Sequence, residues 1–258
     1  MTPEAIARYA GELYAALRAQ RTVAPLTTRE RDITIDDAYA ISLGLLERRL
    51  QDGEKIVGKK IGVTSKAVQS MLDVHQPDFG YLTDAMLYGG KMPISQKLIQ
   101  ARAEGEIAFR LKRSLRGPGV TPGDVLDATE RVMACFEVVD SRITDWKIRI
   151  QDTIADNASS GLFVLGDEAD PRDVDFEGCE MVVEKNGAFL SRGYGNAALG
   201  SPLICVAWLA NTLGARGVAL DAGEIVLSGS LVPLEPVRAG DRMSLSITGI
   251  GSASVEFT

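Results

Sequence analysis

From residue 56 onward the chain is a succession of short apolar runs broken by glycine, and this pattern constrains the fold most. Regular helices do not separate the runs, which disfavours a doubly wound parallel sheet and favours a largely antiparallel, curved β architecture. We therefore expect an α+β protein. The segments with the length and composition of strands are 55–63, 105–111, 134–142, 161–166, 179–187, 224–232, 242–250 and 252–258.

The first 55 residues have a different pattern. Apolar residues recur at helical spacing in 2–20 and again from residue 36 to about 53. We therefore expect an N-terminal helical segment, 1–55, followed by a β-rich catalytic domain, 56–258. Shorter helices are expected at 65–72, 121–132 and 201–217.

Composition excludes some classes of function. The net charge is −7, whereas nucleic-acid-binding proteins are more often basic. No apolar run approaches the roughly 18 residues of a membrane span, and the N-terminus lacks the pattern of a secretory signal. The odd number of widely spaced cysteines, Cys135, Cys179 and Cys205, indicates buried, reduced thiols in a cytoplasmic protein.

Three glutamates suggest a metal site. Glu104 and Glu106 lie two residues apart in an expected strand, so they share one face within about 7 Å of each other, where like charges repel. Glu137 lies inside the most apolar strand, 134–142. Three carboxylates on two strands can coordinate Mg²⁺ or Mn²⁺, and a cation would relieve the repulsion. The alternative is that the glutamates form the solvent face of an amphipathic strand.

Two consecutive lysines form a second candidate group. Lys59 and Lys60 point to opposite faces of an expected strand, so one should face inward. A buried lysine can have a depressed pKa and act as an acid, a base or an anion partner. The alternative is two surface lysines.

Two further segments carry polar side chains. Asp78 follows Pro77 in an expected loop, where it is either functional or an ordinary turn aspartate. Small hydroxyls and backbone amides in 152–160 could bind a carboxylate, or they could simply cap a turn. The chain lacks a Gly-x-Ser-x-Gly motif and has a single histidine, which disfavours a Ser-His-Asp nucleophile.

Four stretches together show a resemblance to a known family. They are GKKIGVTSKAVQSMLDVHQPDFGYL (58–82), RAEGEIAF (102–109), FEVVDSRITDWKIRIQDTIADNASSG (136–161) and GIGSASVEF (249–257). They closely resemble the hydratase/decarboxylase branch of the fumarylacetoacetate hydrolase superfamily, and within it the 2-hydroxypenta-2,4-dienoate hydratases of the meta-cleavage pathway for aromatic compounds. The resemblance runs from about residue 1 to 258.

This resemblance implies a rolled or barrel-like mixed sheet with N-terminal helices, and a site that holds Mg²⁺ or Mn²⁺. It implies no organic cofactor. It also implies roles for individual residues. The metal ligands would be Glu104, Glu106 and Glu137, the catalytic residues Lys60 and Asp78, and the substrate-binding residues Lys60 and Ser160.

The implied activity is addition of water to 2-hydroxypenta-2,4-dienoate, which gives 4-hydroxy-2-oxopentanoate. A 4-oxalocrotonate decarboxylase or a dicarboxylate-specific hydratase remains the alternative, although the decarboxylases tend to lack QPDFG (76–80) and RITDWKI (142–148). The resemblance further implies a homo-oligomer, often a pentamer or decamer, and a possible complex with a 4-oxalocrotonate decarboxylase.

Overall fold

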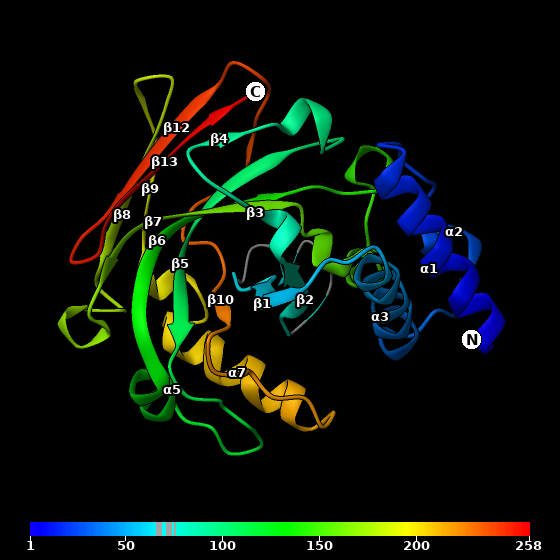
Figure 1. Ribbon diagram of the computed structural model, residues 1–258, viewed down its shortest axis with the longest axis horizontal. Helices are drawn as coiled ribbons and strands as arrows, with labels where there is room; N and C mark the ends of the chain where they lie inside the picture. Colours follow the sequence, from blue (N-terminus) through cyan, green and yellow to red (C-terminus); the bar gives the residue numbers. More distant parts are fainter. Residues whose placement is uncertain (66–68, 71–73, 75) are drawn as a thin grey trace.

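The computed structural model describes residues 1–65, 69–70, 74 and 76–258, and in it a curled mixed sheet forms the centre of the molecule (Figure 1). The strands lie in the order β2–β1–β10–β5–β6–β7–β3, with β11 beside β5. Most neighbours are antiparallel, but β1 runs parallel to β10 and β3 to β7. The strands are β1 (Ile56–Gly62), β2 (Asp78–Thr83), β3 (Leu87–Tyr88), β5 (Arg102–Leu111), β6 (Thr129–Val139), β7 (Leu162–Ala169), β10 (Ile225–Leu227) and β11 (Glu235–Pro236).

A second sheet packs against the outer side of β6 and β7 through β13. Its order is β4–β13–β12–β8–β9, and Asn186 and Gly187 form the hairpin turn between β8 and β9. The strands are β4 (Lys91–Met92), β8 (Glu180–Lys185), β9 (Ala188–Tyr194), β12 (Arg242–Ile247) and β13 (Gly251–Phe257).

The helices begin where the sequence supplies caps. Thr2 caps the first helix with its hydroxyl, and Thr34 caps the third through a capping box with Asp37. The α-helices are α1 (Pro3–Arg18), α2 (Leu26–Arg29), α3 (Ile35–Gln51), α5 (Pro122–Ala128), α6 (Ile150–Ala155) and α7 (Pro202–Gly214). The 3-10 turns are η1 (Asp84–Met86), η2 (Ile94–Gln96), η3 (Thr144–Trp146), η4 (Asn157–Ser159), η5 (Pro171–Asp173) and η6 (Gly195–Ala197).

The N-terminal helices form a layer beside the curled sheet (Figure 1). Leu13 of α1 and Leu45 of α3 belong to the same core cluster as Ile61 of β1 and Phe79 of β2. Helices and strands therefore share one apolar core. The division at residue 55 stays a prediction.

Two expectations need correction, and a third is not tested. The helix expected over 121–132 ends at Ala128, because Thr129 begins a strand that pairs with β5 along most of its length. Asp78 is not in a loop but is the first residue of β2, a strand with every residue buried and hence no alternation to signal it. The helix expected at 65–72 falls largely outside the described residues.

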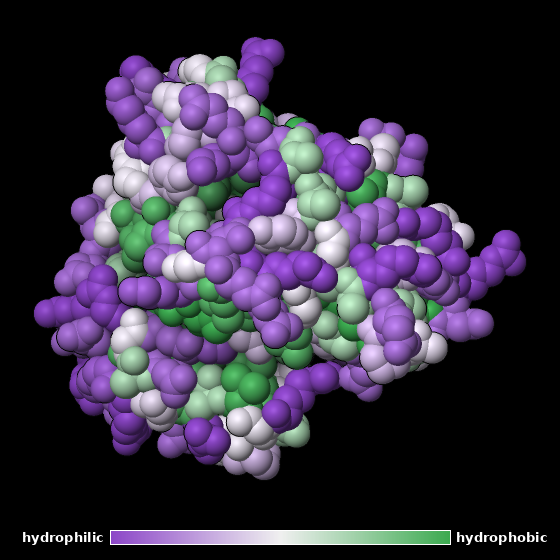
Figure 2. All heavy atoms as spheres, turned by 45° about the vertical axis from the view of Figure 1, so that its right-hand side comes forward, coloured by the Kyte–Doolittle hydropathy of each residue, from purple (hydrophilic) through white to green (hydrophobic). Residues whose placement is uncertain are grey.

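One apolar segment is longer than expected. Gly195–Gly214 could cross a membrane by length and composition, contrary to the expectation that no run approaches that length. Half of this window is buried inside the structure, and α7 contributes Val206 and Leu209 to the core. Buried core helices pass the same test, so this is weak evidence for a span. On the face drawn in Figure 2, hydrophilic side chains predominate and apolar ones form separate patches.

Candidate active site

Three glutamates meet inside the curled sheet. β5 and β6 pair so that Glu104 lies directly opposite Glu137, and Glu106 follows two residues later on the same face. One carboxylate oxygen from each glutamate lies within 4.8 Å of the other two. Glu106 and Glu137 are fully buried, so the alternative of a solvent-facing strand is wrong for them.

This arrangement is electrostatically unfavourable without a counter-ion. Burial, together with the neighbouring carboxylates, raises the pKa of Glu104 to about 7 and raises the pKa of Glu106 well above its usual range. Glu106 Oε2 accepts a 2.8 Å hydrogen bond from the Gly229 amide, but Glu106 Oε1 and both oxygens of Glu137 accept none from the described residues. Buried carboxylate oxygens at this spacing that accept no hydrogen bond fit a divalent cation that prefers oxygen ligands.

The two lysines of β1 have different partners. Lys60 reaches across the inside of the curled sheet, where its Nζ lies 3.3 Å from Glu137 Oε1. Lys59 points to the opposite face and its Nζ lies 2.6 Å from Glu224 Oε1. Both are buried, so one lysine faces the candidate site as predicted, and the alternative of two surface lysines is wrong.

The pKa of Lys60 is not depressed. Burial alone would lower it, but the carboxylates of Glu137 and Asp78 outweigh burial and raise the pKa above its ordinary value. The neighbouring carboxylates therefore favour the charged form of Lys60.

Asp78 lies beside Lys60 because β2 pairs with β1, which places Gly62 opposite Asp78. A Cβ atom on Gly62 would lie 2.3 Å from Asp78 Oδ1 and 3.3 Å from Lys60 Nζ, so glycine is needed for the two groups to approach. Asp78 is fully buried. Burial raises its pKa, and the Lys60 charge opposes this shift.

A cavity of about 630 Å³ opens onto these groups. Lys60, Asp78 and Glu104 line it, whereas Glu106 and Glu137 lie behind its wall. Much of the rest is apolar, which suits a small organic acid with a hydrocarbon chain. The apolar lining residues are Ile61, Val63, Val139, Trp146, Ile148, Ala158, Ala197, Leu231, Val232, Pro233 and Leu234.

α6 and the segment after it bring hydroxyl groups to the cavity, but not the hydroxyl expected. The Ser160 hydroxyl donates a 2.7 Å hydrogen bond to the Asn157 carbonyl. Ser159 and Thr153 line the cavity, and their hydroxyl oxygens lie 3.2 Å apart. The described cavity wall therefore includes Ser159 and not Ser160.

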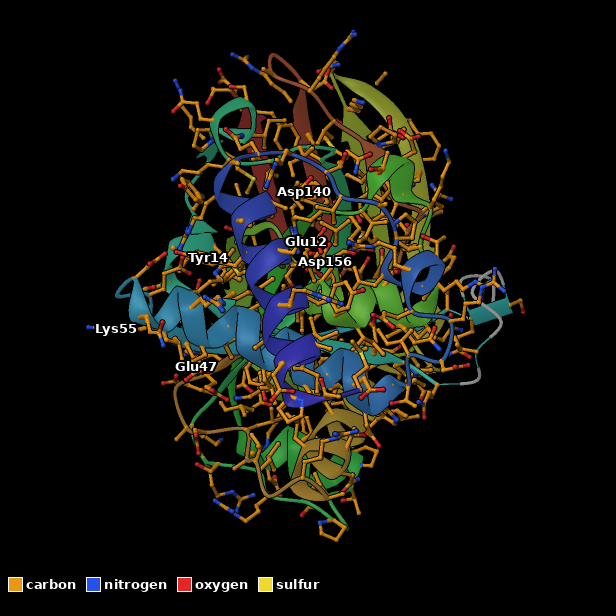
Figure 3. All side chains as sticks on the ribbon, turned by 90° about the vertical axis from the view of Figure 1, so that its right-hand side faces the viewer. Glu12, Tyr14, Glu47, Lys55, Asp140 and Asp156 are labelled. Carbon is orange, nitrogen blue, oxygen red and sulfur yellow. The ribbon has the colours of Figure 1, made fainter. Side chains whose placement is uncertain are left out.

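A buried arginine fixes this segment. Arg142 Nε donates a 2.6 Å hydrogen bond to Asp156, and its other nitrogens reach the carbonyls of Asp140, Asp156 and Ser160. The carboxylate of Asp140 also lies near this guanidinium, 3.9 Å from Arg142 Nη1, and Figure 3 labels both aspartates in the view onto the helical side of the molecule. Asn157, Ala158 and Ser159 all have positive φ, a strained backbone that such contacts can hold in place.

Sequence reasoning did not single out several residues of the site. Arg142, Thr153 and Trp146 are examples, and so is Arg102 at the start of β5. The only signal for Arg142 was a charged residue at the end of the most apolar expected strand, 134–142.

The fold and the carboxylate site define the class of the protein. The family model for the C-terminal region of fumarylacetoacetate (FAA) hydrolase matches residues 55–258, and the chain belongs to this family.

Two curated relatives and one solved structure are similar to this chain over most of its length. A 2-hydroxypent-2,4-dienoate hydratase of Pseudomonas putida is 70% identical over 211 residues, which cover 81% of this chain and 95% of the relative. A 2-hydroxyhexa-2,4-dienoate hydratase of Comamonas testosteroni is 58% identical over 250 residues, 95% of each chain. A 4-oxalocrotonate decarboxylase from Pseudomonas putida G7, solved with magnesium and adipate, superposes with a TM-score of 0.96 at 35% identity, covering 100% of this chain and 99% of the other.

Proposed function

We propose that the protein is a divalent-metal-dependent hydro-lyase that adds water to 2-hydroxypenta-2,4-dienoate and forms 4-hydroxy-2-oxopentanoate in meta-cleavage degradation of aromatic compounds. The observation that carries this proposal is the buried glutamate cluster, which contacts Lys60 through Glu137 and reaches the cavity lined by Lys60 and Asp78 through Glu104. The hydratase names of relatives at 58–70% identity support the same reaction.

In this proposal Glu104, Glu106 and Glu137 hold Mg²⁺ or Mn²⁺. When bound, the cation supplies a Lewis acid for the substrate's carboxylate and 2-oxygen, where negative charge develops. The reaction needs the 2-hydroxyl proton removed and a proton delivered to C5, after which water adds its hydroxyl at C4 and a proton is delivered to C3. Lys60 and Asp78, which both border the space left by Gly62, carry these proton transfers jointly. Ser159 and Thr153, rather than Ser160, offer hydroxyls that can orient the substrate.

An isotope experiment tests the reaction directly. The Mg²⁺-loaded protein is incubated with 2-hydroxypenta-2,4-dienoate in H₂¹⁸O, and the products are followed by NMR and mass spectrometry. We expect 4-hydroxy-2-oxopentanoate with ¹⁸O at C4, and none after treatment with EDTA. Unchanged substrate in the presence of metal would contradict the proposed activity.

Decarboxylation is the second candidate, because the solved decarboxylase shares the fold over the whole chain. The assay is release of CO₂ from 4-oxalocrotonate by the Mg²⁺-loaded protein. Release of CO₂ without hydration of the dienoate would favour this candidate, or a related enzyme on the same scaffold, over the hydratase.

We also propose that the protein acts in the cytoplasm as a homo-oligomer, a pentamer or decamer, and that it forms a complex with a 4-oxalocrotonate decarboxylase. Related chains of one fold offer similar interfaces, and direct transfer would protect an unstable dienol from ketonisation in water. Co-expression with a tagged decarboxylase, followed by size-exclusion chromatography, tests both parts. A lone monomer that the tagged partner does not retain would exclude them.

A further inference from the structure

Arg102 occupies an unusual position in the cavity. It begins β5 two residues before Glu104, so both side chains lie on the same face and both line the cavity. The residue is partly buried. In the described part of the chain, no carboxylate lies within ion-pair distance of its guanidinium, and no hydrogen bond from it is found. Arg110, near the other end of the same strand, instead donates a 3.1 Å hydrogen bond to Glu168.

The guanidinium is nevertheless held in place. Its central carbon lies 4.7 Å from the centroid of the Trp146 ring. Trp146 is fixed in turn, because its Nε1 donates a 3.0 Å hydrogen bond to the Gln100 carbonyl and its backbone has the strained φ of 56°. Stacking uses the face of a guanidinium and leaves its edge N–H donors free. Arg102 therefore presents an ordered set of donors for an anion.

The charges in the cavity indicate what these donors bind. Among the described lining residues, the other cation is Lys60, which already pairs with the buried Glu137. The remaining charged groups of the wall are carboxylates, those of Asp78, Glu104 and Asp145. Besides a divalent metal on the glutamates, an anionic substrate in this cavity can pair with one further unengaged cation among the described lining residues, and Arg102 is placed to provide it.

We propose that Arg102 is a substrate-binding residue whose guanidinium, stacked on Trp146, binds the carboxylate that all 2-hydroxy-dienoate substrates share. This inference rests on the proposed function for the identity of the ligand and adds the residue that recognises its charge. An arginine edge can donate two parallel hydrogen bonds to a carboxylate, which gives orientation as well as affinity.

The test is binding of 2-oxopentanoate, a non-reacting acid with one carboxylate, to the Mg²⁺-loaded enzyme by calorimetry. Loss of charge-assisted hydrogen bonds predicts a Kd about 10- to 100-fold higher for Arg102→Gln. The Kd of Arg102→Lys should lie between those of the wild type and Arg102→Gln, because lysine keeps the charge and lacks the forked donors of arginine. Arg110→Gln is the matched control on the same strand and should bind as the wild type does.

Kinetics and a second ligand complete the test. Arg102→Gln should raise KM for the dienoate by a similar factor and leave kcat within a few-fold. An unchanged Kd for 2-oxopentanoate in a folded Arg102→Gln variant overturns the proposal, and so does a loss confined to the dicarboxylate 2-oxoadipate. If the variant does not fold, an Arg102→Lys variant with the wild-type Kd also overturns it. Wild-type protein that binds 2-oxopentanoate but does not hydrate the dienoate would refute the proposed function and not the role of Arg102.

Discussion

Buried acidic residues set the chemistry at the residue scale. Glu106 and Glu137 are enclosed by β5 and β6, where their repulsion has no solvent to screen it. Such a site is unfavourable when metal-free and becomes favourable when a cation shares the negative charge. Stability, pH dependence and activity should therefore all respond to the metal.

We expect Glu106→Gln to abolish metal-dependent turnover while the fold persists, because it removes one anionic ligand from a closed site. A ligand at a free concentration of 100 times its Kd raises the free energy of unfolding by about 2.7 kcal/mol. Mg²⁺ at this concentration should stabilise the wild type by about this amount, and the variant should lose this increase. Urea unfolding with Mg²⁺ or EDTA measures it. Glu168→Gln, on the exposed part of β7, is the control and should keep the metal effect. A fully active Glu106→Gln variant would refute its role as a ligand.

The metal-free protein should become less stable as the pH rises. The folded-state pKa of Glu104 is raised from 4.5 to about 7, so between these values the folded state holds a proton that the unfolded chain has lost. The free energy of unfolding then falls by about 1.4 kcal/mol per pH unit from this group. Compared with Glu104→Gln in EDTA, the wild type should therefore lose more stability across this window. If the free energies of unfolding of the wild type and Glu104→Gln change in parallel with pH, the raised pKa of Glu104 is contradicted.

Lys60→Met should lower turnover by about 10²- to 10⁴-fold without weakening Mg²⁺ binding, because lysine is not a ligand for a hard cation and general acid–base groups contribute on this scale. Lys59→Met is the matched control on the other face of β1. Breaking its buried pair with Glu224 should cost about 3–5 kcal/mol of stability but leave the turnover of the folded enzyme intact. Near wild-type turnover in Lys60→Met would remove this lysine from the mechanism.

At the scale of elements, strand register decides whether the site exists. The opposition of Glu104 and Glu137 depends on the pairing of β5 with β6, and that of Gly62 and Asp78 on the pairing of β1 with β2. Alternation within a strand indicates which residues share a face, but it says nothing of which residue lies opposite on the next strand.

Gly62→Ala should disturb the site through this pairing. The added Cβ would displace the Asp78 carboxylate, whose oxygen lies 2.3 Å from its position, and misplacement by about 1 Å can reduce turnover about 100-fold. Expressed as free energies, the rise in the activation barrier from steady-state kinetics should exceed the decrease in the free energy of unfolding measured with urea. Gly89→Ala, where nothing lies within 4 Å of the new Cβ, is the control. Equal turnover in Gly62→Ala and Gly89→Ala would contradict the close approach of the Asp78 carboxylate to Gly62.

The sequence was informative where patterns are local. It identified the glutamate pair on one strand face and the two N-terminal helices. It missed β2, because a strand buried along its whole length lacks alternation. It also favoured Ser160 over Ser159, since the left-handed turn that rotates these side chains is imposed by tertiary contacts with Arg142 and Tyr81.

At the scale of the whole molecule, the N-terminal helices and the curled sheet share one apolar core. α3 contacts both α6 and η4, the segments that carry Thr153 and Ser159 to the cavity. The helical layer therefore supports one wall of the site, although the family model begins only at residue 55.

A crystal structure with Mg²⁺ and oxalate tests the central claim most directly, because oxalate mimics the chelating end of a 2-oxo acid. The account predicts a cation about 2.0–2.1 Å from oxygens of Glu104, Glu106 and Glu137, with oxalate on its open positions facing Lys60 and Asp78. A cation bound elsewhere in the cavity, with the three glutamates left without it at saturating Mg²⁺, would contradict the account.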